Sequence, residues 1–240
     1  CDHIISYGEL MSSQIIVTAF NYSGITAAWK DTRTLIQTNT NFGNASVNAP
    51  VTRQQITDYI AACKETLVVM PGFIAADANH ETTTLGRGGS DYTAAIMAAA
   101  TDAGCLEIWT DVPGMMTADP RWVSGAKVIS SISYQEAMEL SHFGAKVLYP
   151  PTIQPVLRKE IPVVIKNTFA PGDAGTVIQQ KPFTNGNAIR GISSISNIAL
   201  FRLEGSGMVG VPGFSSRLFE ALSEAQINVI LITQGSSEHT

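Results

Sequence analysis

The segment from residue 82 to residue 95 holds the side chains whose types and spacing best suit the binding of an anion. Three threonines lead into a Gly-Arg-Gly-Gly turn at 86–89, and Ser90 and Asp91 sit where the cap of an alanine-rich helix is expected. The N–H groups and the positive end of a helix N-terminus favour a negatively charged ligand. Arg87 adds a planar guanidinium that suits a carboxylate or a phosphate. The sequence therefore predicts an anion site, with an ordinary glycine turn and a solvated arginine as the alternative.

Two further polar loops are expected at the same edge of the protein. Gly72 follows a predicted strand at 67–70, and the loop at 110–114 ends another at 106–111. Ligands of open α/β sheets bind beyond the carboxyl ends of the strands, so these loops and the glycine turn are expected to converge on one crevice. Asp111 and Asp119 could hold Mg²⁺ directly or through water, although aspartate also forms ordinary turns at such positions.

The elements that must position these loops alternate between helices and strands. We predict helices at 4–20, 51–63, 133–143 and 153–157, and a further strand at 161–167. Strand, helix and strand joined by turns are typical of an α/β fold with a parallel sheet. Apolar positions that include Ile15 and Ile16 suit packing of the first helix on a sheet. Glu9 falls near the start of that helix, where a favourable partner of the helix dipole is the simpler interpretation.

The chain is expected to divide into two domains. A polar stretch at 179–190 suggests a boundary, which gives a first domain at 1–180, a linker at 181–192 and a second domain at 193–240. In the second domain we predict a strand at 198–204, a helix at 214–225 and a strand at 227–233. The opening Cys-Asp-His and the incomplete second domain indicate a fragment that lacks the N-terminal part of its first domain.

Composition excludes several classes of protein. Of the 240 residues, 45% are apolar and 15% are charged, as in a globular protein with a buried core. The net charge of −5 argues against a nucleic-acid partner. No apolar run approaches the ~20 residues of a membrane span, and no signal peptide is visible. Three widely spaced cysteines indicate reduced thiols in the cytoplasm, and four histidines without ligand spacing indicate no structural zinc.

Several blocks of the sequence resemble aspartate kinases, which belong to the amino acid kinase superfamily. The block at 84–95 is similar to the signature of these enzymes, and its Gly-Arg-Gly-Gly-Ser-Asp core is specific to them. The similarity continues at 107–114, 117–121, 133–140, 143–148, 161–163 and 167–169, of which the Asp-Pro-Arg block is shared across the superfamily. The tail at 205–238 resembles the start of an ACT regulatory domain. Within it, 231–238 is most similar to the bifunctional aspartokinase–homoserine dehydrogenase branch.

The resemblance implies a fold and a reaction. The fold is a three-layer α/β sandwich with a mainly parallel sheet, followed by the start of an α+β ACT domain. The reaction is phosphorylation of the β-carboxylate of L-aspartate by ATP and Mg²⁺, the first step of lysine, threonine and methionine biosynthesis. A carboxylate is already ionised at neutral pH, so this reaction needs positioning and charge cancellation rather than a general base. Two alternatives stay open: a superfamily kinase with another substrate, and a catalytically silent subunit that senses an amino acid.

Partners and further cofactors also follow from the resemblance. ACT domains usually pair between subunits, so a homodimer or homotetramer is expected. The branch similarity favours threonine over lysine as the feedback effector. NADP would be needed only if a homoserine dehydrogenase domain follows Thr240.

The resemblance assigns site residues through their local motifs. Glu9 resembles the glutamate that receives the amino group of aspartate, and Arg87 the arginine that clamps a carboxylate, while Asp91 orders the loop. The implied sites are catalytic (Arg87, Asp91), substrate-binding (Glu9, Arg87, Gly88, Gly89, Ser90), nucleotide-binding (Thr110, Asp111, Met116, Arg121, Lys146, Val147) and effector-binding (Gln234, Ser237 and the loop at 207–213). Lys146 follows a predicted helix, so a dipole partner is its alternative role. Turn and strand-end structure is the alternative at the effector site.

The sequence departs from the family pattern at three points. Met116 stands where the family often has tyrosine, which replaces a nucleotide contact with thioether packing. Tyr149 stands where histidine is usual after the Lys-Val-Leu block. The Lys-Phe-Gly-Gly segment that opens the catalytic domain of the family, and whose lysine contacts the phosphoryl group, is absent from the sequence.

Overall fold

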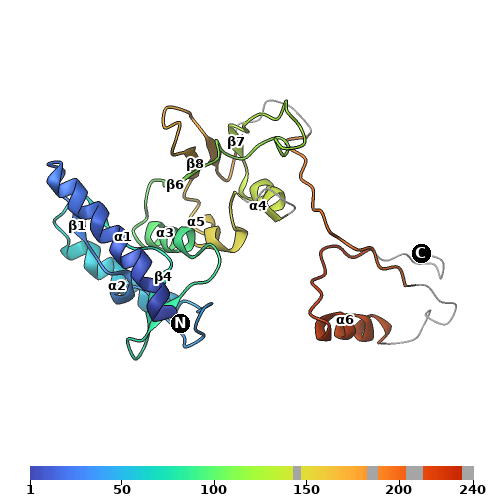
Figure 1. The fold of residues 1–240 in the computed structure, drawn as a ribbon, viewed down its shortest axis with the longest axis horizontal. Helices are drawn as coiled ribbons and strands as arrows, with labels where there is room; N and C mark the ends of the chain where they lie inside the picture. The colour runs from blue at the N-terminus through green and yellow to red at the C-terminus, as the bar shows by residue number, and fades with distance from the viewer. Residues whose placement is uncertain (143–146, 183–188, 204–212, 234–240) are drawn as a thin grey trace. The chain divides into compact units, whose positions relative to one another are not determined.

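The computed structural model describes residues 1–142, 147–182, 189–203 and 213–233 (Figure 1). The chain divides into two units, Cys1–Ser194 and Ile195–Thr240. The first unit is a mixed α/β structure that carries the candidate site. The second unit contains one helix within its described residues, α6 (Phe214–Glu224).

The first half of the first unit carries two small sheets. Its elements are α1 (Asp2–Tyr22), β1 (Ala28–Trp29), the 3₁₀ helix η1 (Thr32–Thr34), β2 (Gln37–Thr38), α2 (Ala49–Ala62), β3 (Val68–Val69), β4 (Ile74–Asp77), β5 (Thr82–Thr84) and α3 (Gly89–Ala100). Strand β1 pairs in parallel with β3, and β2 pairs in parallel with β4. Strands β4 and β5 form an antiparallel hairpin, which delivers the chain to the glycine turn and α3.

The second half is built on one larger sheet. Its elements are β6 (Leu106–Thr110), β7 (Ser131–Ile132), α4 (Tyr134–His142), the 3₁₀ helix η2 (Pro150–Ile153), α5 (Gln154–Leu157), β8 (Val163–Asn167) and β9 (Thr176–Ile178). The strand order is β6-β8-β9-β7, with parallel pairs at both edges and an antiparallel pair in the centre. Among the described residues of the first unit, four of the six strand pairs are parallel, which confirms the predicted α/β fold.

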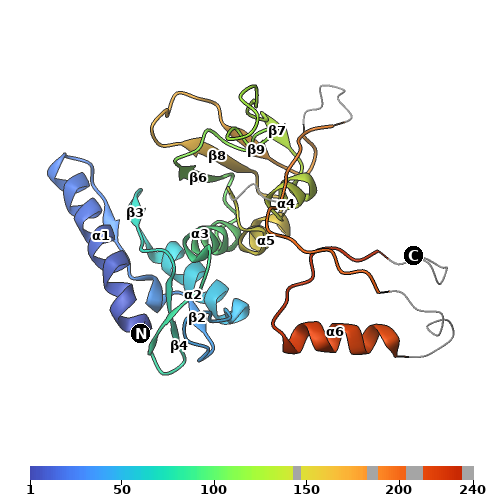
Figure 2. The same ribbon diagram turned by 45° about the vertical axis from the view of Figure 1, so that its right-hand side comes forward.

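Helix α3 lies between the two halves (Figure 2). Ala95 and Ala98 pack into the apolar cluster around β6 and β8, whereas Ile96 packs into the cluster formed with Ile36 and Ile56. A helix with close neighbours on two sides needs small side chains, which explains its run of alanines. The start of α3 is therefore fixed by packing from both halves of the unit.

Helix α1 packs on the first half through an unexpected face. The prediction that Ile15 and Ile16 are packed on a sheet is wrong, because these side chains are 65% and 47% exposed. The buried positions are Asp2, Ser6, Ser13 and Val17. Two of them dock by hydrogen bonds: Asp2 accepts from the N–H and Oγ1 of Thr84 at 2.9 and 3.0 Å, and the Ser13 hydroxyl accepts from Nε1 of Trp29 at 2.9 Å. None of the helices that the structure describes combines the length and the apolar character required to cross a bilayer.

The sequence predicted the second unit less well than the first. Helix α6 confirms the helix expected at 214–225. No strand forms over residues 198–203 or 227–233, although strands were predicted there. Strands are stabilised by ladder hydrogen bonds and a packed face, whereas Leu200 and Leu231 are 93% and 80% exposed. The alternating pattern alone therefore does not make these segments strands.

Candidate active site

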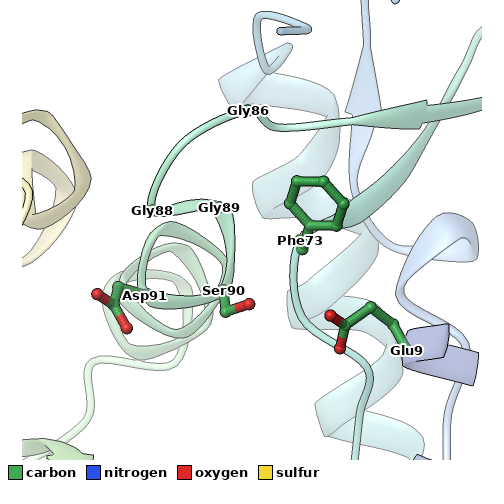
Figure 3. A pocket seen from close by; sticks show the side chains of 7 residues that line it. All are labelled: Glu9, Phe73, Gly86, Gly88, Gly89, Ser90 and Asp91. Atoms are coloured by element: carbon green, nitrogen blue, oxygen red, sulfur yellow. The ribbon is translucent and has the colours of Figure 1, made fainter. Parts of the chain in front are cut away.

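An open cavity of about 350 Å³ lies at the start of helix α3. Three segments that are distant in the sequence meet there: helix α1, the turn before β4, and the glycine turn that leads into α3 (Figure 3). The residues that line it are Glu9, Phe73, Gly86, Gly88, Gly89, Ser90 and Asp91. Five of these were predicted as site residues from the sequence, and the structure brings them together around one space.

The glycine turn requires glycine for two separate reasons. Gly86 and Gly88 have φ angles of 72° and 70°, which lie in the left-handed region that disfavours other residues. A Cβ on Gly89 would lie 2.8 Å from Cδ2 of Phe73, so this glycine permits close approach of the helix. The turn thus needs glycine at 86 and 88 for their backbone conformation, and at 89 because a side chain would clash with Phe73.

Helix α3 begins earlier than expected. Gly88 is its N-cap and no side chain caps it, so Ser90 and Asp91 lie within the first turn of the helix. The prediction that they form the cap is wrong, because the left-handed Gly88 ends the turn before them. The N–H of Gly89 donates to the carbonyl oxygen of Gly86 at 3.1 Å. Without a side-chain cap, the next N–H groups of the first turn, those of Ser90 and Asp91, are left to water or to an anionic ligand.

Glu9 faces the start of α3 across the cavity. The prediction that it lies near the start of its helix is wrong, because α1 begins at Asp2 and Glu9 falls two turns further along. The side chain is half-buried, and its carboxylate points into the cavity toward Ser90 (Figure 3). Among the described residues, no hydrogen bond or ion pair satisfies this carboxylate. A negative group of this kind suits an ammonium ligand.

Arg87 lies at the rim of the cavity rather than inside it. Its side chain is exposed, and its guanidinium carbon lies 5.4 Å from the centre of the Tyr149 ring. The neighbouring Gly86 and Gly88 both line the cavity, although Arg87 does not. The backbone therefore places an exposed cationic side chain directly beside the space that Glu9 faces.

Sequence reasoning missed Phe73 and Thr93 as residues that shape the site. Phe73 has a φ of 69°, a costly conformation for a residue with a side chain. Its N–H donates to Oγ1 of Thr93 at 3.0 Å, and that hydroxyl donates to the carbonyl oxygen of Gly89 at 2.9 Å. Thr93 thus ties the turn to the first turn of α3. Pro71 and Gly72 signalled a turn before Phe73, but nothing in the sequence marks Thr93.

We expect Thr93→Val to lower the free energy of unfolding by about 1–2 kcal/mol, because it leaves the Phe73 N–H without its partner. Urea denaturation measures this change. The matched control is Thr57→Val, since the Thr57 hydroxyl makes only an exposed bond to the carbonyl of Arg53, and we expect it to change stability by less than about 0.5 kcal/mol. Equal effects of the two substitutions would contradict the structural role of Thr93.

Asp91 is on the opposite side of α3 from Ser90 (Figure 3). Burial raises the pKa of its carboxyl group above the ordinary value. The folded protein therefore binds this proton more tightly than the unfolded chain, and the contribution of Asp91 to stability falls as pH rises through the two pKa values. The ionised carboxylate is consequently a cost to the folded state at neutral pH.

We expect Asp91→Asn to raise the urea midpoint at about pH 7, because asparagine removes the buried charge. The gain should shrink toward about pH 4, where the carboxyl group of an unfolded aspartate begins to protonate. Asp173→Asn, in an exposed loop, controls for loss of one surface charge. A midpoint at neutral pH that falls in the Asp91 variant would show that the carboxylate stabilises the fold instead.

The predicted convergence of three loops is only partly seen. A Cβ on Gly72 would lie 3.0 Å from Cα of Ser90, so the first two loops are in contact. The loop at 110–114 does not line the cavity. Thr110 ends β6, its carbonyl oxygen accepts from the N–H of Thr168 at 2.8 Å, and its hydroxyl lies 3.2 Å from Oδ1 of Asp111. This loop therefore presents a separate polar edge of the larger sheet.

The two aspartates considered for Mg²⁺ differ in their surroundings. Asp119 forms an ion pair with Arg121 at 2.6 Å, which lowers the pKa of Asp119 and raises that of Arg121. The Asp111 carboxylate is exposed and has no ion pair within the described ranges. These ranges contain no group of three or more potential metal ligands. Asp111 is thus the better candidate for a cation that is bound mainly by phosphates and water.

The other predicted residues are less informative. Met116 bridges Val128 in a short antiparallel contact, and Val147 packs against the larger apolar cluster. Lys146, Gln234 and Ser237 lie outside the described residues, as does most of the loop at 207–213. Their assignments stay predictions.

Family patterns match two parts of this chain, and related proteins match it along its whole length. The pattern of the amino acid kinase family matches residues 2–167, and that of an ACT domain matches residues 201–240. A maize protein named bifunctional aspartokinase/homoserine dehydrogenase 1, chloroplastic, is 40% identical over 244 residues, which cover 100% of this chain and 26% of that protein. The chain therefore spans about a quarter of the length of this relative.

Two solved structures are also similar. The crystal structure of E. coli aspartokinase III in complex with aspartate and ADP, called the R-state, is 38% identical with a TM-score of 0.81, covering 98% of this chain and 52% of that one. The structure of the same enzyme in complex with lysine and aspartate, called the T-state, is 37% identical with a TM-score of 0.78, covering 98% and 53%. The matched region is thus about half of each solved chain.

Proposed function

The chain belongs to the amino acid kinase family, and we propose that within this family it is an aspartate kinase, which transfers the γ-phosphoryl group of ATP to the β-carboxylate of L-aspartate. The observation that carries the proposal is the cavity in which the Glu9 carboxylate faces the start of helix α3, with Arg87 at the rim. An amino acid with an ammonium group and two carboxylates complements this distribution of charge. The related E. coli enzyme was solved with aspartate and ADP, which supports the same choice.

The charged and polar groups in and beside the cavity have separate tasks in this reaction. Glu9 binds the ammonium group of aspartate, which fixes the orientation of the substrate. Arg87 and the first-turn N–H group of Ser90 bind a carboxylate, because a guanidinium fork and a helix N-terminus both favour this ligand. The β-carboxylate is ionised at neutral pH and attacks without a general base. The protein contributes position and cancellation of charge, which are the main requirements of phosphoryl transfer.

The polar edge at the end of β6 is proposed to hold the nucleotide. Thr110 and Asp111 lie at the carboxyl end of a strand in an α/β sheet, the usual place for such ligands. Mg²⁺ is usually bound by one or two carboxylates together with substrate phosphates and water, and the exposed Asp111 carboxylate fits that role. The cation would neutralise phosphate charge during transfer. Arg121, Met116, Val147 and Lys146 complete the proposed nucleotide contacts.

The choice of substrate is tested by ADP release from the full-length protein with ATP, Mg²⁺ and single acceptors. The acceptors are L-aspartate, L-glutamate and uridine monophosphate, which represent one acid of the proposed kind, a longer acid and a nucleotide. We expect release that depends on L-aspartate. Release with another acceptor alone would favour a different kinase of the family, and binding of an amino acid without release would favour a silent sensor.

Regulation and assembly are proposed from the second unit. Residues 201–240 match an ACT domain, and we propose that an amino acid, threonine rather than lysine, is the effector, with Gln234 and Ser237 among its contacts. The T-state structure of the E. coli relative contains lysine, so both effectors must be compared. We further propose a homodimer or homotetramer in the cytoplasm, and a fused homoserine dehydrogenase that uses NADP. Inhibition by threonine and not by lysine would support the proposed effector, and the reverse would contradict it.

A further inference from the structure

The contact between Arg87 and Tyr149 joins two exposed residues that lie far apart in the sequence. Arg87 stands between Gly86 and Gly88, which both have left-handed φ angles. Tyr149 follows the buried Leu148 and precedes Pro150 and Pro151, so its backbone is held in the extended form with φ −94° and ψ 110°. The backbone of Tyr149 is thus placed by its neighbours independently of the arginine.

The contact places a cation over the face of an aromatic ring. The guanidinium carbon is 5.4 Å from the ring centre, within the range in which the ring attracts a cation. In the described part of the chain, Arg87 has no hydrogen bond or ion pair besides this contact. Attraction to a ring face satisfies none of the guanidinium N–H donors, so these donors stay available for a carboxylate. The same contact can therefore persist while the arginine binds a ligand.

We propose that Tyr149 is a positioning residue for Arg87, which it holds at the rim of the cavity with the N–H edge available to the substrate carboxylate. An arginine side chain on a glycine-flanked loop loses much rotamer freedom when it binds. A ring that restricts the side chain beforehand reduces this loss and so strengthens substrate binding. The inference rests on the proposed function, because it names the acidic substrate as the ligand of Arg87.

The test compares steady-state kinetics of the full-length protein with Tyr149 replaced by alanine, leucine or phenylalanine. A contact of this strength at an exposed site predicts that Tyr149→Ala and Tyr149→Leu raise KM for L-aspartate by about two- to five-fold. Leucine keeps apolar volume without an aromatic face, so it separates stacking from packing. Tyr149→Phe keeps the face and should restore most of the wild-type KM. The KM for ATP should stay close to the wild-type value in all three variants.

A double-mutant cycle shows whether Tyr149 acts through Arg87. In an Arg87→Ala background, Tyr149→Leu should have no further effect on KM for L-aspartate. The control is Tyr22→Ala, since Tyr22 is an exposed tyrosine at the end of α1, thirteen residues or ~20 Å along the helix from Glu9. This variant should leave both KM values unchanged.

The outcomes separate the two claims. Turnover by the wild type with an unchanged KM for L-aspartate in Tyr149→Leu would overturn the role of Tyr149 and leave the proposed function standing. Additive effects of the Tyr149 and Arg87 substitutions would also overturn it. Wild-type protein without turnover that depends on L-aspartate would overturn both.

Discussion

Arg87→Ala is expected to lower kcat/KM for L-aspartate by roughly 10- to 150-fold, which corresponds to the loss of about 1.5–3 kcal/mol from hydrogen bonds between charged groups. The effect should fall mainly on L-aspartate and only weakly on KM for ATP, because Arg87 stands beside the cavity that Glu9 faces. Since the side chain is exposed and makes no hydrogen bond or ion pair with the described residues besides its contact with the Tyr149 ring, the fold should lose no more than about 1 kcal/mol.

Two further variants define what Arg87 contributes. Arg87→Lys keeps the charge but removes the planar fork, so its activity should lie between those of the wild type and Arg87→Ala. Arg53→Ala, on the exposed face of α2, removes an arginine that does not line the cavity and should leave L-aspartate kinetics unchanged. Wild-type kinetics in Arg87→Ala would show that the rim arginine has no part in substrate binding.

Glu9→Gln is expected to raise KM for L-aspartate by about 10- to 100-fold, because it removes the negative partner of the substrate ammonium group while preserving shape. The Glu9 carboxylate points into the cavity and has no competing partner in the described structure, so its charge is available to a ligand. Kinetics with varied L-aspartate at saturating ATP measure the change. Glu139→Gln, an exposed glutamate on α4, is the matched control.

A substrate analogue makes the Glu9 test specific. Succinate has both carboxylates of aspartate but no amino group. If Glu9 binds that amino group, competitive inhibition by succinate should be equally strong in the wild type and in Glu9→Gln. A loss of succinate binding in the variant as large as the loss of L-aspartate binding would indicate a general disturbance of the cavity instead.

The parts of the site that the sequence could predict are those built from local chemistry. The glycine turn and the helix after it are specified within a dozen neighbouring residues, and the structure places both at the cavity. Glu9 was assigned to the site by resemblance, and the structure places it at the cavity. Only its predicted place near the start of the helix was wrong, because the helix begins at Asp2. The α/β fold could also be predicted from local sequence, because each helix or strand has a characteristic spacing of apolar residues.

The parts that the sequence could not predict depend on contacts between distant residues. Thr93 meets Phe73, and Arg87 meets Tyr149, across 20 and 62 positions of the chain respectively. The left-handed conformation of Phe73 is imposed by that bond and by the pairing of its carbonyl with Leu85, and no local signal marks it. The predicted strands do not form over residues 198–203 and 227–233. An alternating pattern leads to a strand only where a partner strand supplies ladder hydrogen bonds and packing, and this also depends on distant residues.

Trapping of the reaction product tests the central claim most directly. An acyl phosphate reacts with hydroxylamine, so a kinase that phosphorylates the β-carboxylate yields aspartyl hydroxamate from ATP, Mg²⁺ and L-aspartate. The full-length protein should form this hydroxamate in an L-aspartate-dependent reaction, and Arg87→Ala and Glu9→Gln should lose most of it at limiting L-aspartate. A folded full-length wild type that binds ATP but forms no hydroxamate would contradict the account.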